Sequence, residues 1–282
     1  MKKSILTLCA ATVLTFSLST TSVAQVKLPQ ASSTTSITQG LGIKNIALSY
    51  QRPNINGRVI FGNLIPYNEV WRTGANNIPV IKFEEEVTIE GNKVPAGTYG
   101  ILTIPTKGDW TIILTKNSNQ WGAYTYDKKD DLIRFNVKST KLSNKVETFT
   151  MQFENVTTNS AVLSLSWENS STQFSIKVDQ TQEILANIEE AMKGDKKPYL
   201  QAAQFYLNNN LDIKKALVWV DEAEKENPEA PYIRYWKAKI QLKAGDKKGA
   251  IATAQKGVEI AQKGNNAEYV KLNNQVIKEA GK

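Results

Sequence analysis

The feature that most constrains the fold of this chain is a change of hydrophobic period near residue 179. Up to that point, apolar residues occur in short runs rich in Val, Ile, Thr and aromatic side chains, and turn residues separate the runs. Beyond it, apolar residues recur at helical spacing. Many short strands without intervening helices are typical of an antiparallel sandwich or barrel. The sequence therefore predicts an all-β, sandwich-like antiparallel domain over residues 25–179, followed by an all-α domain over residues 180–282.

Short strands are expected throughout the first domain. Gly91-Asn92 predicts a hairpin turn, and the polar stretch 25–39 predicts a loosely held lead-in with room for one short strand. The expected strands are residues 45–50, 80–83, 87–90, 99–104, 110–115, 132–137, 148–153, 161–167 and 174–178.

Helices and an internal repeat are expected in the second domain. Asp212 and Asp246 are good N-caps and lie 34 residues apart, as do Ala216 and Ala250. A 34-residue period of paired helices with small residues at the crossings is the tetratricopeptide signature. We expect two tetratricopeptide-like units with flanking helices, the last of which can act as a cap. The expected helices are residues 181–192, 199–207, 213–226, 230–243, 247–262 and 267–280.

The first residues indicate export. Lys2 and Lys3 precede a short apolar run over residues 5–18, and Ser22-Val23-Ala24 places small residues where a signal peptidase reads them. We expect a signal peptide over residues 1–24 that is cleaved after Ala24. The apolar run is shorter than the ~20 residues of a membrane span, so no transmembrane segment is expected after cleavage. The expected location is the periplasm or the medium outside the cell.

Composition excludes several chemistries. Cleavage removes Cys9, the one cysteine, and the chain has no histidine. Ser-His-Asp and Cys-His nucleophiles are therefore excluded, as is zinc held by His or Cys; no metal and no cofactor are expected. The formal net charge of +8 falls to +6 without Lys2 and Lys3, divided equally between the domains with interspersed signs. Such a surface is ordinary for a soluble protein and argues against nucleic-acid binding.

Unusual chemistry concentrates in residues 50–76, YQRPNINGRVIFGNLIPYNEVWRTGAN. The guanidinium groups of Arg52, Arg58 and Arg72 can each hold a carboxylate, phosphate or sulfate. If they converge, the one acid in this stretch, Glu69, leaves spare positive charge. The alternative is that each arginine pairs internally, for example Arg72 with Glu69, and locks a turn.

Aromatic rings and amides extend this candidate binding site. Flat rings stack on sugars and peptides, so Trp71, Trp110, Trp121, Tyr124 and Tyr126 could line a groove. The side chains of Asn76, Asn77, Asn117 and Gln120 could supply hydrogen bonds beside them. The alternative is that the rings belong to the core and that the asparagines cap turns. The candidate ligand-binding residues are Arg52, Arg58, Trp71, Arg72, Asn76 and Trp121.

No catalytic residue can be assigned from the sequence. Glu69, Asp109 and Asp127 are the candidate acids, with Tyr67 or Tyr126 as proton donors. A glycoside hydrolase needs two facing carboxylates roughly 5–10 Å apart, and none of the three lies in a recognisable catalytic motif. The sequence therefore favours a non-catalytic role.

Short motifs across the first domain resemble the signature of the domain-of-unknown-function family numbered 2911. They are RP (52–53), GR (57–58), IFG (60–62), LIPY (64–67), VWRTGAN (70–76), PAGTY (95–99), IP (104–105), WTII (110–113) and QWG (120–122). The resemblance extends from about residue 27 to about residue 178. It implies an exported β-rich domain found mainly in Bacteroidetes-type Gram-negative bacteria, and it carries no established activity. The helical region lies outside it.

The leading hypothesis is an exported binding or scaffolding protein. Its helical repeats would engage a protein partner, and the Arg/Trp face of the β domain would hold an anionic or glycan-like ligand. In the helices, Tyr232 and Trp236 share a face at a spacing of four residues, which fits either a peptide-binding surface or packing between repeats. Two alternatives remain: a histidine-independent hydrolase acting on a glycan, and a purely structural envelope protein.

Overall fold

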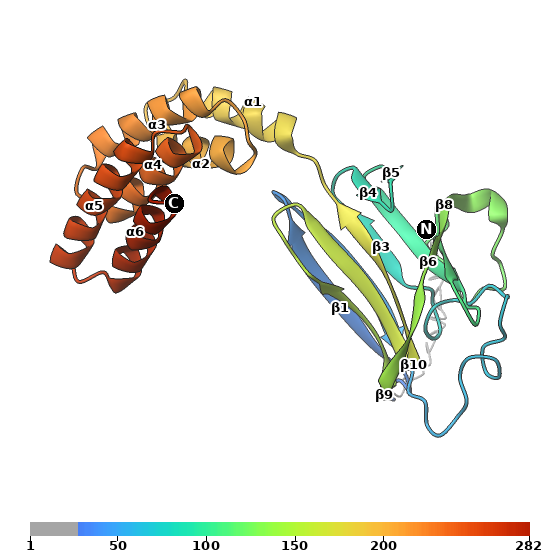
Figure 1. The fold of residues 1–282 in the computed structure, drawn as a ribbon. Helices are drawn as coiled ribbons and strands as arrows, with labels where there is room; N and C mark the ends of the chain where they lie inside the picture. The colour runs from blue at the N-terminus through green and yellow to red at the C-terminus, as the bar shows by residue number, and fades with distance from the viewer. Residues whose placement is uncertain (1–27) are drawn as a thin grey trace, which may run out of the picture. The chain divides into compact units, whose positions relative to one another are not determined.

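The computed structural model describes residues 28–282, so the expected signal peptide and its cleavage site lie outside the described part. The chain divides between Lys177 and Val178 into two compact units, which we call the β unit and the helical unit. Two antiparallel sheets form the first and six helices the second (Figure 1), which confirms the predicted order of an all-β and an all-α domain.

The β unit holds a six-stranded and a four-stranded sheet. The order in the larger sheet is β1-β2-β3-β6-β7-β8, and in the smaller sheet β5-β4-β10-β9. The strands are β1 Ser33–Leu41, β2 Lys44–Arg52, β3 Val80–Phe83, β4 Val87–Ile89, β5 Asn92–Val94, β6 Gly97–Ile104, β7 Trp110–Thr115, β8 Asp131–Val137, β9 Ser139–Glu154 and β10 Ser160–Lys177.

The region predicted as a loose lead-in contains a full strand. β1 pairs with β2 along its whole length, from Ser33 opposite Arg52 to Leu41 opposite Lys44. Its residues mostly alternate between exposed and half-buried, and Leu41 alone is buried. Backbone pairing with β2, rather than an apolar face, therefore orders this polar sequence.

Three further strand predictions need correction. The predicted strand 148–153 is only the last part of β9, which begins at Ser139. The predicted strands 161–167 and 174–178 are one strand, β10, which runs through the polar residues between them with register shifts against β9. The predicted hairpin turn joins β4 to β5, but Ile89 pairs with Asn92, so the turn residues are Glu90 and Gly91. Both have positive φ, 45° and 81°, as a two-residue hairpin turn requires.

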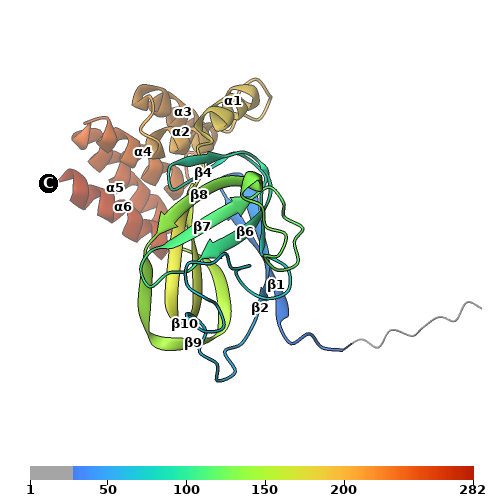
Figure 2. The same ribbon diagram turned by 90° about the vertical axis from the view of Figure 1, so that its right-hand side faces the viewer.

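The two sheets lie face to face (Figures 1 and 2). Side chains from both meet between them. Phe135 of β8 contacts Phe174 of β10 edge-on, with ring centroids 5.4 Å apart. The hydroxyl of Tyr50 in β2 donates to the carbonyl of Met151 in β9 and accepts from its N–H, both at 2.9 Å. These contacts join the sheets into a sandwich.

Residues 53–79, which we call the crossing segment, connect β2 to β3 and contact both sheets. Near its start, the carbonyl of Pro53 accepts the N–H of Phe149 in β9 at 2.9 Å. Further along, Trp71 and Thr103 of β6 exchange backbone hydrogen bonds of 2.7 and 3.0 Å. Thr103 lies in the part of β6 that the short strand β3 does not reach. The crossing segment therefore bridges the two sheets.

All six predicted helices are present, each within one residue of its expected ends. They are α1 Thr181–Ala191, α2 Tyr199–Asn208, α3 Ile213–Glu226, α4 Pro231–Lys243, α5 Lys247–Lys263 and α6 Ala267–Ala280. The predicted N-caps are confirmed: Asp212 accepts from the N–H groups of Lys214 and Lys215, and Asp246 from that of Gly249. None of the described helices is long and apolar enough to cross a membrane.

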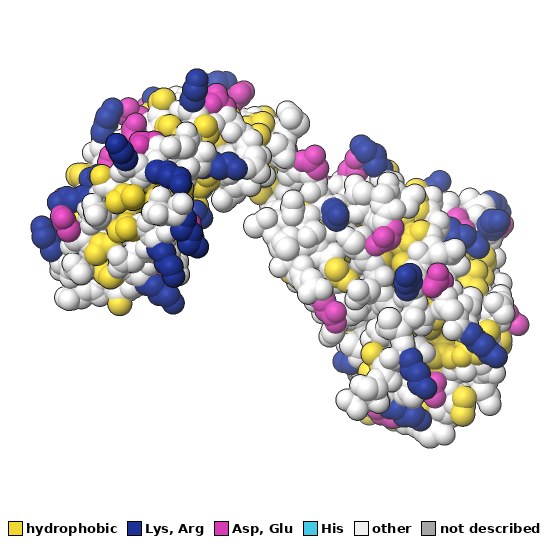
Figure 3. Space-filling model, viewed as in Figure 1, with side chains coloured by type: hydrophobic (Ala, Val, Ile, Leu, Met, Phe, Trp, Pro, Cys, Tyr) yellow, Lys and Arg dark blue, Asp and Glu magenta, His cyan; other side chains and the backbone are white. Residues whose placement is uncertain are grey.

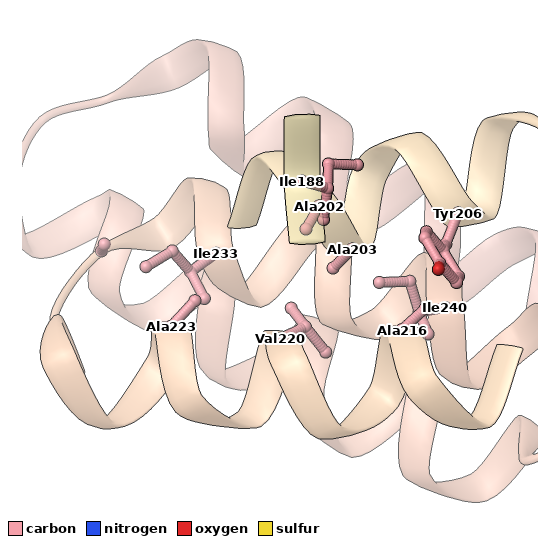
Figure 4. Packing of buried hydrophobic residues seen from close by; sticks show 10 residues of the cluster. Ile188, Ala202, Ala203, Tyr206, Ala216, Val220, Ala223, Ile233 and Ile240 are labelled. Carbon is pink, nitrogen blue, oxygen red and sulfur yellow. The ribbon is translucent and has the colours of Figure 1, made fainter. Parts of the chain in front are cut away.

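Small buried residues set the packing of the helical unit. Ala202 and Ala203 of α2 and Ala216 of α3 have no exposed surface and lie in one cluster with Val220 and Tyr206 (Figure 4). Alanine has a small side chain, so these positions let neighbouring helices approach closely.

A glycine determines the crossing of α5 and α6. A Cβ at Gly257 would stand 2.3 Å from Oδ1 and 2.8 Å from Nδ2 of Asn273. Asn273 is fully buried, and its Nδ2 donates to the carbonyls of Tyr269 at 2.8 Å and Pro231 at 3.4 Å. The amide cannot move aside without losing these bonds.

We expect Gly257→Ala to lower the free energy of unfolding by about 1–3 kcal/mol, because overpacking at this crossing exceeds the roughly 1 kcal/mol that alanine gains over glycine in a helix. Denaturant unfolding followed by circular dichroism measures the change. The double variant Gly257→Ala/Asn273→Ala should be more stable than the sum of the two single losses indicates, since the clash needs both side chains. A Gly257→Ala protein as stable as the parent would contradict the tight crossing.

Candidate functional site

A pocket of about 330 Å³ lies beside the crossing segment in the β unit. Its lining includes two arginines and two tryptophans and no acidic residue. The lining residues are Ala31, Ser32, Pro53, Asn54, Asn56, Arg58, Leu64, Ile65, Trp71, Arg72, Gly74, Ala75 and Trp167. The pocket thus brings together three of the six predicted ligand-binding residues: Arg58, Trp71 and Arg72.

Arg72 has no partner for its guanidinium among residues 28–282. Its side chain is half-buried, and it makes no hydrogen bond or ion pair with any described residue. The alternative pairing with Glu69 is not formed; Glu69 is exposed and has no ion-pair partner within residues 28–282. A guanidinium offers five N–H donors, so a partly enclosed, unpaired one favours an anion with several acceptor oxygens.

Arg58 adds a second positive charge to the pocket. Its Nε donates to the carbonyl of Ile55 at 2.9 Å and its Nη2 to that of Asn54 at 2.6 Å, so the head group is held in place without being neutralised. Near this lining, the carboxylate of Glu147 accepts the N–H of Asn56 at 2.9 Å. The charge of Arg58 therefore stays available to a ligand, because the nearby carboxylate of Glu147 binds a backbone N–H and not this guanidinium.

Arg52 has a structural role. It does not line the pocket. Its Nε donates to the carbonyl of Phe149 at 3.1 Å and its Nη2 to the hydroxyl of Thr150 at 2.8 Å, which ties β2 to β9 across the sandwich. Of the three arginines expected to converge, two therefore do so and the third fastens the sheets together.

Strained backbone follows directly after Arg72. Thr73 is β-branched and has φ 58°, a left-handed conformation that costs about 1–3 kcal/mol outside glycine. It is fully buried, and its hydroxyl donates to the carbonyl of Trp71 at 3.2 Å. Gly74 follows with φ 135°, and a Cβ there would stand 2.9 Å from the carbonyl oxygen of Gln51. Such strain is typical of positions where a fold holds a functional side chain.

The indole of Trp71 belongs mainly to the core. It is 8 % exposed, and it stacks on Trp167 with centroids 5.9 Å apart and planes 14° from parallel. Phe61, Trp110 and Phe149 surround it edge-on. The alternative of core packing therefore holds for Trp71 and Trp110, and the small exposed part of Trp71 gives the pocket an apolar wall.

Trp167 is a lining residue that the sequence analysis missed. Leu163, Leu165 and Trp167 are all buried at a spacing of two residues along β10. That alternation places them on the face of the strand that points into the sandwich. This two-residue spacing can be read from the sequence, and it could have predicted that Trp167 points into the sandwich.

Asn76 and Trp121 lie beside the pocket rather than in its lining. The carbonyl of Asn76 accepts the N–H of Gly122 at 2.8 Å, and Ile78 donates its N–H to the carbonyl of Gln120 at 3.1 Å. This short pairing fixes the loop between β7 and β8 against the crossing segment. Asn76 has φ 55°, in keeping with a turn role, whereas the ring of Trp121 is 61 % exposed.

The candidate catalytic acids do not meet in the pocket. Glu69, Asp109 and Asp127 are all exposed, and none lines it. Asp127 caps a short 3-10 helix by accepting the N–H of Lys129 at 3.0 Å, and it forms an ion pair with the amine of that lysine at 2.8 Å. Hydrogen bonds from the side chain and backbone of Lys129 lower the pKa of Asp127. This geometry supplies no facing carboxylate pair for a hydrolase.

The candidate proton donor Tyr126 is also engaged elsewhere. Its hydroxyl donates to the carboxylate of Asp131 at 3.0 and 3.1 Å and accepts from Arg134. Burial, followed by the hydrogen bond to Asp131, raises the pKa of Tyr126. No group of three or more His, Cys, Asp or Glu side chains able to hold a metal ion occurs within residues 28–282.

A second recess, of about 400 Å³, lies on the helical unit between α2 and α4. It is lined by Leu207, Asn208, Lys239, Leu242 and Lys243, and we call it the basic groove. The amine of Lys239 also lies over the rings of Tyr235 and Trp236, at 5.4 and 5.0 Å from their centroids. Figure 3 shows one face of the helical unit on which hydrophobic side chains lie among lysine and arginine side chains.

The lysines of the basic groove differ from a neighbouring lysine on the same helix. Lys237 pairs with Asp221 at 2.8 Å and with Glu224 at 2.7 Å. Burial opposes its charge, but the hydrogen bonds to these two acids outweigh burial and raise the pKa of Lys237. Lys239 and Lys243 make no ion pair with a described residue. The basic groove therefore carries uncompensated positive charge.

The predicted aromatic face of α4 is used partly for packing. Tyr232 is 36 % exposed, yet its ring lies 6.1 Å from that of Tyr269 in α6. Tyr235 contacts both Tyr269 and Trp236. These ring contacts support the alternative of packing between helices for Tyr232 and Tyr235.

The strained turn after Arg72 gives a testable contrast between two glycines. We expect Gly74→Ala to lower the free energy of unfolding by about 2–4 kcal/mol, because the added Cβ meets a backbone carbonyl and positive φ disfavours alanine. Gly91→Ala is the matched control, since Gly91 also has positive φ but a Cβ there meets nothing within 4 Å. Its loss should be limited to about 1 kcal/mol. Equal losses in denaturant unfolding would show that the close approach at Gly74 contributes nothing.

Among the comparisons with known proteins, one family model matches the β unit. Residues 32–176 match the family model described as "Protein of unknown function (DUF2911)", just over half of the chain. No curated protein and no solved structure matches the chain. The match confirms the resemblance predicted for the first domain and does not cover the helical unit. This chain therefore belongs to the DUF2911 family.

Proposed function

We propose that this protein is an exported, non-catalytic binding protein. Its β unit holds an anionic ligand in the pocket beside the crossing segment, and its helical unit engages a protein partner. The observation that carries the proposal is the unpaired guanidinium of Arg72, half-buried in a pocket with a second arginine and no acidic lining residue.

The size and chemistry of the pocket suit a small anion or one anionic group of a larger ligand. Its volume of about 330 Å³ lies at the lower end of the range for ligand sites. The planar forks of Arg58 and Arg72 match the geometry of carboxylate and phosphate oxygens. A half-buried charge without a partner is unfavourable, and an anion that binds there offsets that cost.

Export is supported by the charge, length and small residues of the segment 1–24, which fit a cleavable signal peptide. A mature chain without cysteine is not exposed to incorrect disulfide formation in an oxidising compartment. The periplasm or the medium outside the cell is therefore the proposed location.

The helical unit is proposed to work as a short tetratricopeptide-like array. α3 and α5 begin 34 residues apart and each starts with a capping aspartate, which supports a repeated pair of helices. The basic groove combines two unpaired lysines with two leucines. Charge complementarity points to a partner segment that carries acidic and bulky apolar side chains.

The anion site is tested by three single variants of the mature chain, with inorganic phosphate and citrate as probes. We expect both probes to raise the melting temperature of the parent protein, because a ligand that binds only the native state stabilises it. Arg72→Gln should weaken binding about tenfold or more, as the loss of a charge-assisted pair of hydrogen bonds of about 1.5–3 kcal/mol implies, and should leave the melting temperature of the free protein close to that of the parent.

Two other variants make this result specific. Arg52→Gln should lower the stability of the free protein, since Arg52 joins β2 to β9, and should leave probe affinity unchanged. Lys82→Gln removes one positive charge from an exposed position on β3 and should change neither. Loss of probe binding in Lys82→Gln as large as in Arg72→Gln would indicate general charge attraction. A screen in which no anion stabilises the parent would favour the structural envelope protein.

The basic groove is tested with a fluorescein-labelled peptide of alternating Glu and Leu residues. We expect Lys239→Glu/Lys243→Glu to weaken peptide binding at least tenfold in fluorescence anisotropy, because charge repulsion replaces attraction at the groove. Lys247→Glu/Lys248→Glu makes the same change of charge at exposed positions at the start of α5 and is the control. If both double variants lose affinity equally, the peptide senses net charge and the groove is not its site.

A further inference from the structure

The loop between β7 and β8 exposes two large aromatic rings. Trp121 is 61 % exposed and Tyr124 is 82 % exposed. Among the ring contacts of the described residues, Trp121 and Tyr124 take part in none, and this separates them from Trp71 and Trp110. Loops often carry binding residues, and Trp and Tyr are enriched among the residues that contribute most to binding, so this pair of rings is a candidate binding surface.

The exposed ring of Tyr124 and the guanidinium of Arg72 both lie close to Gly122, which directly follows Trp121 in the chain. A Cβ at Gly122 would stand 2.6 Å from Cε2 of Tyr124 and 3.4 Å from Nη1 of Arg72. Gly122 has φ 70°, a backbone conformation that favours glycine. The short distances also leave no room for a Cβ at this position. The absence of a side chain there lets the ring of Tyr124 and the guanidinium of Arg72 approach each other.

Backbone pairing holds this arrangement together. The carbonyl of Asn76 accepts the N–H of Gly122, and Asn77 forms a bridge with Trp121. The side-chain amides of Asn76 and Asn77 make no hydrogen bond to a described residue, while their backbone groups do the pairing. Asn77 is exposed and Asn76 half-buried. Two amides therefore remain available next to the rings and the cation.

We propose that this surface, formed by Arg72, Asn76, Asn77, Trp121 and Tyr124, binds an oligosaccharide of carboxylated sugars. The inference rests on the proposed anion site and names the class of its ligand. The C–H faces of sugar rings pack on exposed aromatic faces, the guanidinium of Arg72 binds a sugar carboxylate, and amides exchange hydrogen bonds with hydroxyl groups.

A peptide fits this surface less well. Trp121 and Tyr124 are largely exposed and lie outside the lining of the pocket, so they offer exposed ring surface rather than walls of that pocket. Exposed aromatic rings beside a cation suit hydroxylated sugar rings that pack their C–H faces on the aromatic rings and also carry negative charge.

The mature chain is titrated with four probes: trigalacturonate, maltotriose, triglutamate and inorganic phosphate. Trigalacturonate supplies rings and carboxylates, maltotriose only rings, triglutamate only carboxylates, and phosphate a lone anion. Binding is measured by calorimetry, and protection of Trp121 by acrylamide quenching of fluorescence. We expect trigalacturonate to bind about tenfold or more tighter than maltotriose and triglutamate, and to protect Trp121 from the quencher.

Variants separate this inference from the anion site on which it rests. Trp121→Ala and Tyr124→Ala remove exposed rings, so the free protein should keep its melting temperature. Each should weaken trigalacturonate about tenfold and leave phosphate binding unchanged, whereas Arg72→Gln should weaken both probes. Val156→Ala, at a 43 % exposed position outside the pocket lining, is the control for loss of exposed apolar surface, and it should retain trigalacturonate binding.

Three outcomes would overturn the inference. If trigalacturonate binds no better than maltotriose, or if Trp121→Ala and Tyr124→Ala leave its affinity unchanged, the rings are not a sugar platform. If triglutamate binds as tightly and with the same dependence on the rings, the surface recognises an acidic peptide. If the parent protein still binds phosphate and Arg72→Gln does not, any of these three results leaves the anion site intact. If the parent protein does not bind phosphate, the proposed function is wrong as well.

Discussion

The structure of the β unit depends on the crossing segment being tied to both sheets. Three of its isoleucines, Ile55, Ile60 and Ile78, are at most 3 % exposed, and Ile78 packs against Leu102 and Ile113 of the larger sheet. Its backbone must turn repeatedly to bury them, and the turns fall at residues with positive φ, among them Gly57 and Thr73. A long connection without regular secondary structure is usually mobile, but this one is part of the core. The pocket is the space left where it turns.

Neighbours, rather than residue type, decide what each arginine in this region does. Arg52 meets a carbonyl and a hydroxyl on β9 and becomes a fastening between strands. Arg72 follows a buried tryptophan and precedes a left-handed threonine, so its guanidinium is carried to a place where the fold provides no acceptor. The left-handed conformation of Thr73 costs about 1–3 kcal/mol of stability. The fold therefore holds the chain next to Arg72 in a fixed conformation at a cost in stability.

The elements that could be predicted from sequence are those set by local physics. α3 and α6 begin and end at the predicted residues because a capping side chain precedes each and the helical period is regular. β1 was underestimated and β10 was divided because their polar residues are ordered by pairing with distant strands. The role of Arg52 was equally inaccessible, since its partners lie 97 and 98 residues away in sequence. Arg58, Trp71 and Arg72 share one short segment, and all three line the pocket. The exposure of Trp121 could not be predicted, because it depends on which aromatic residues the core buries; Trp71 and Trp110 are buried, whereas Trp121 is not.

β9 is the outer strand of its sheet, and the contacts along it have a consequence for solubility. The backbone groups of Phe149 are occupied by Pro53 and Arg52, and both those of Met151 by the hydroxyl of Tyr50. A bare strand edge offers such groups to another molecule, which can add a strand and begin a fibril. Here a loop, a guanidinium and a phenol occupy that edge, so the central part of this 16-residue strand is closed to growth of intermolecular sheets.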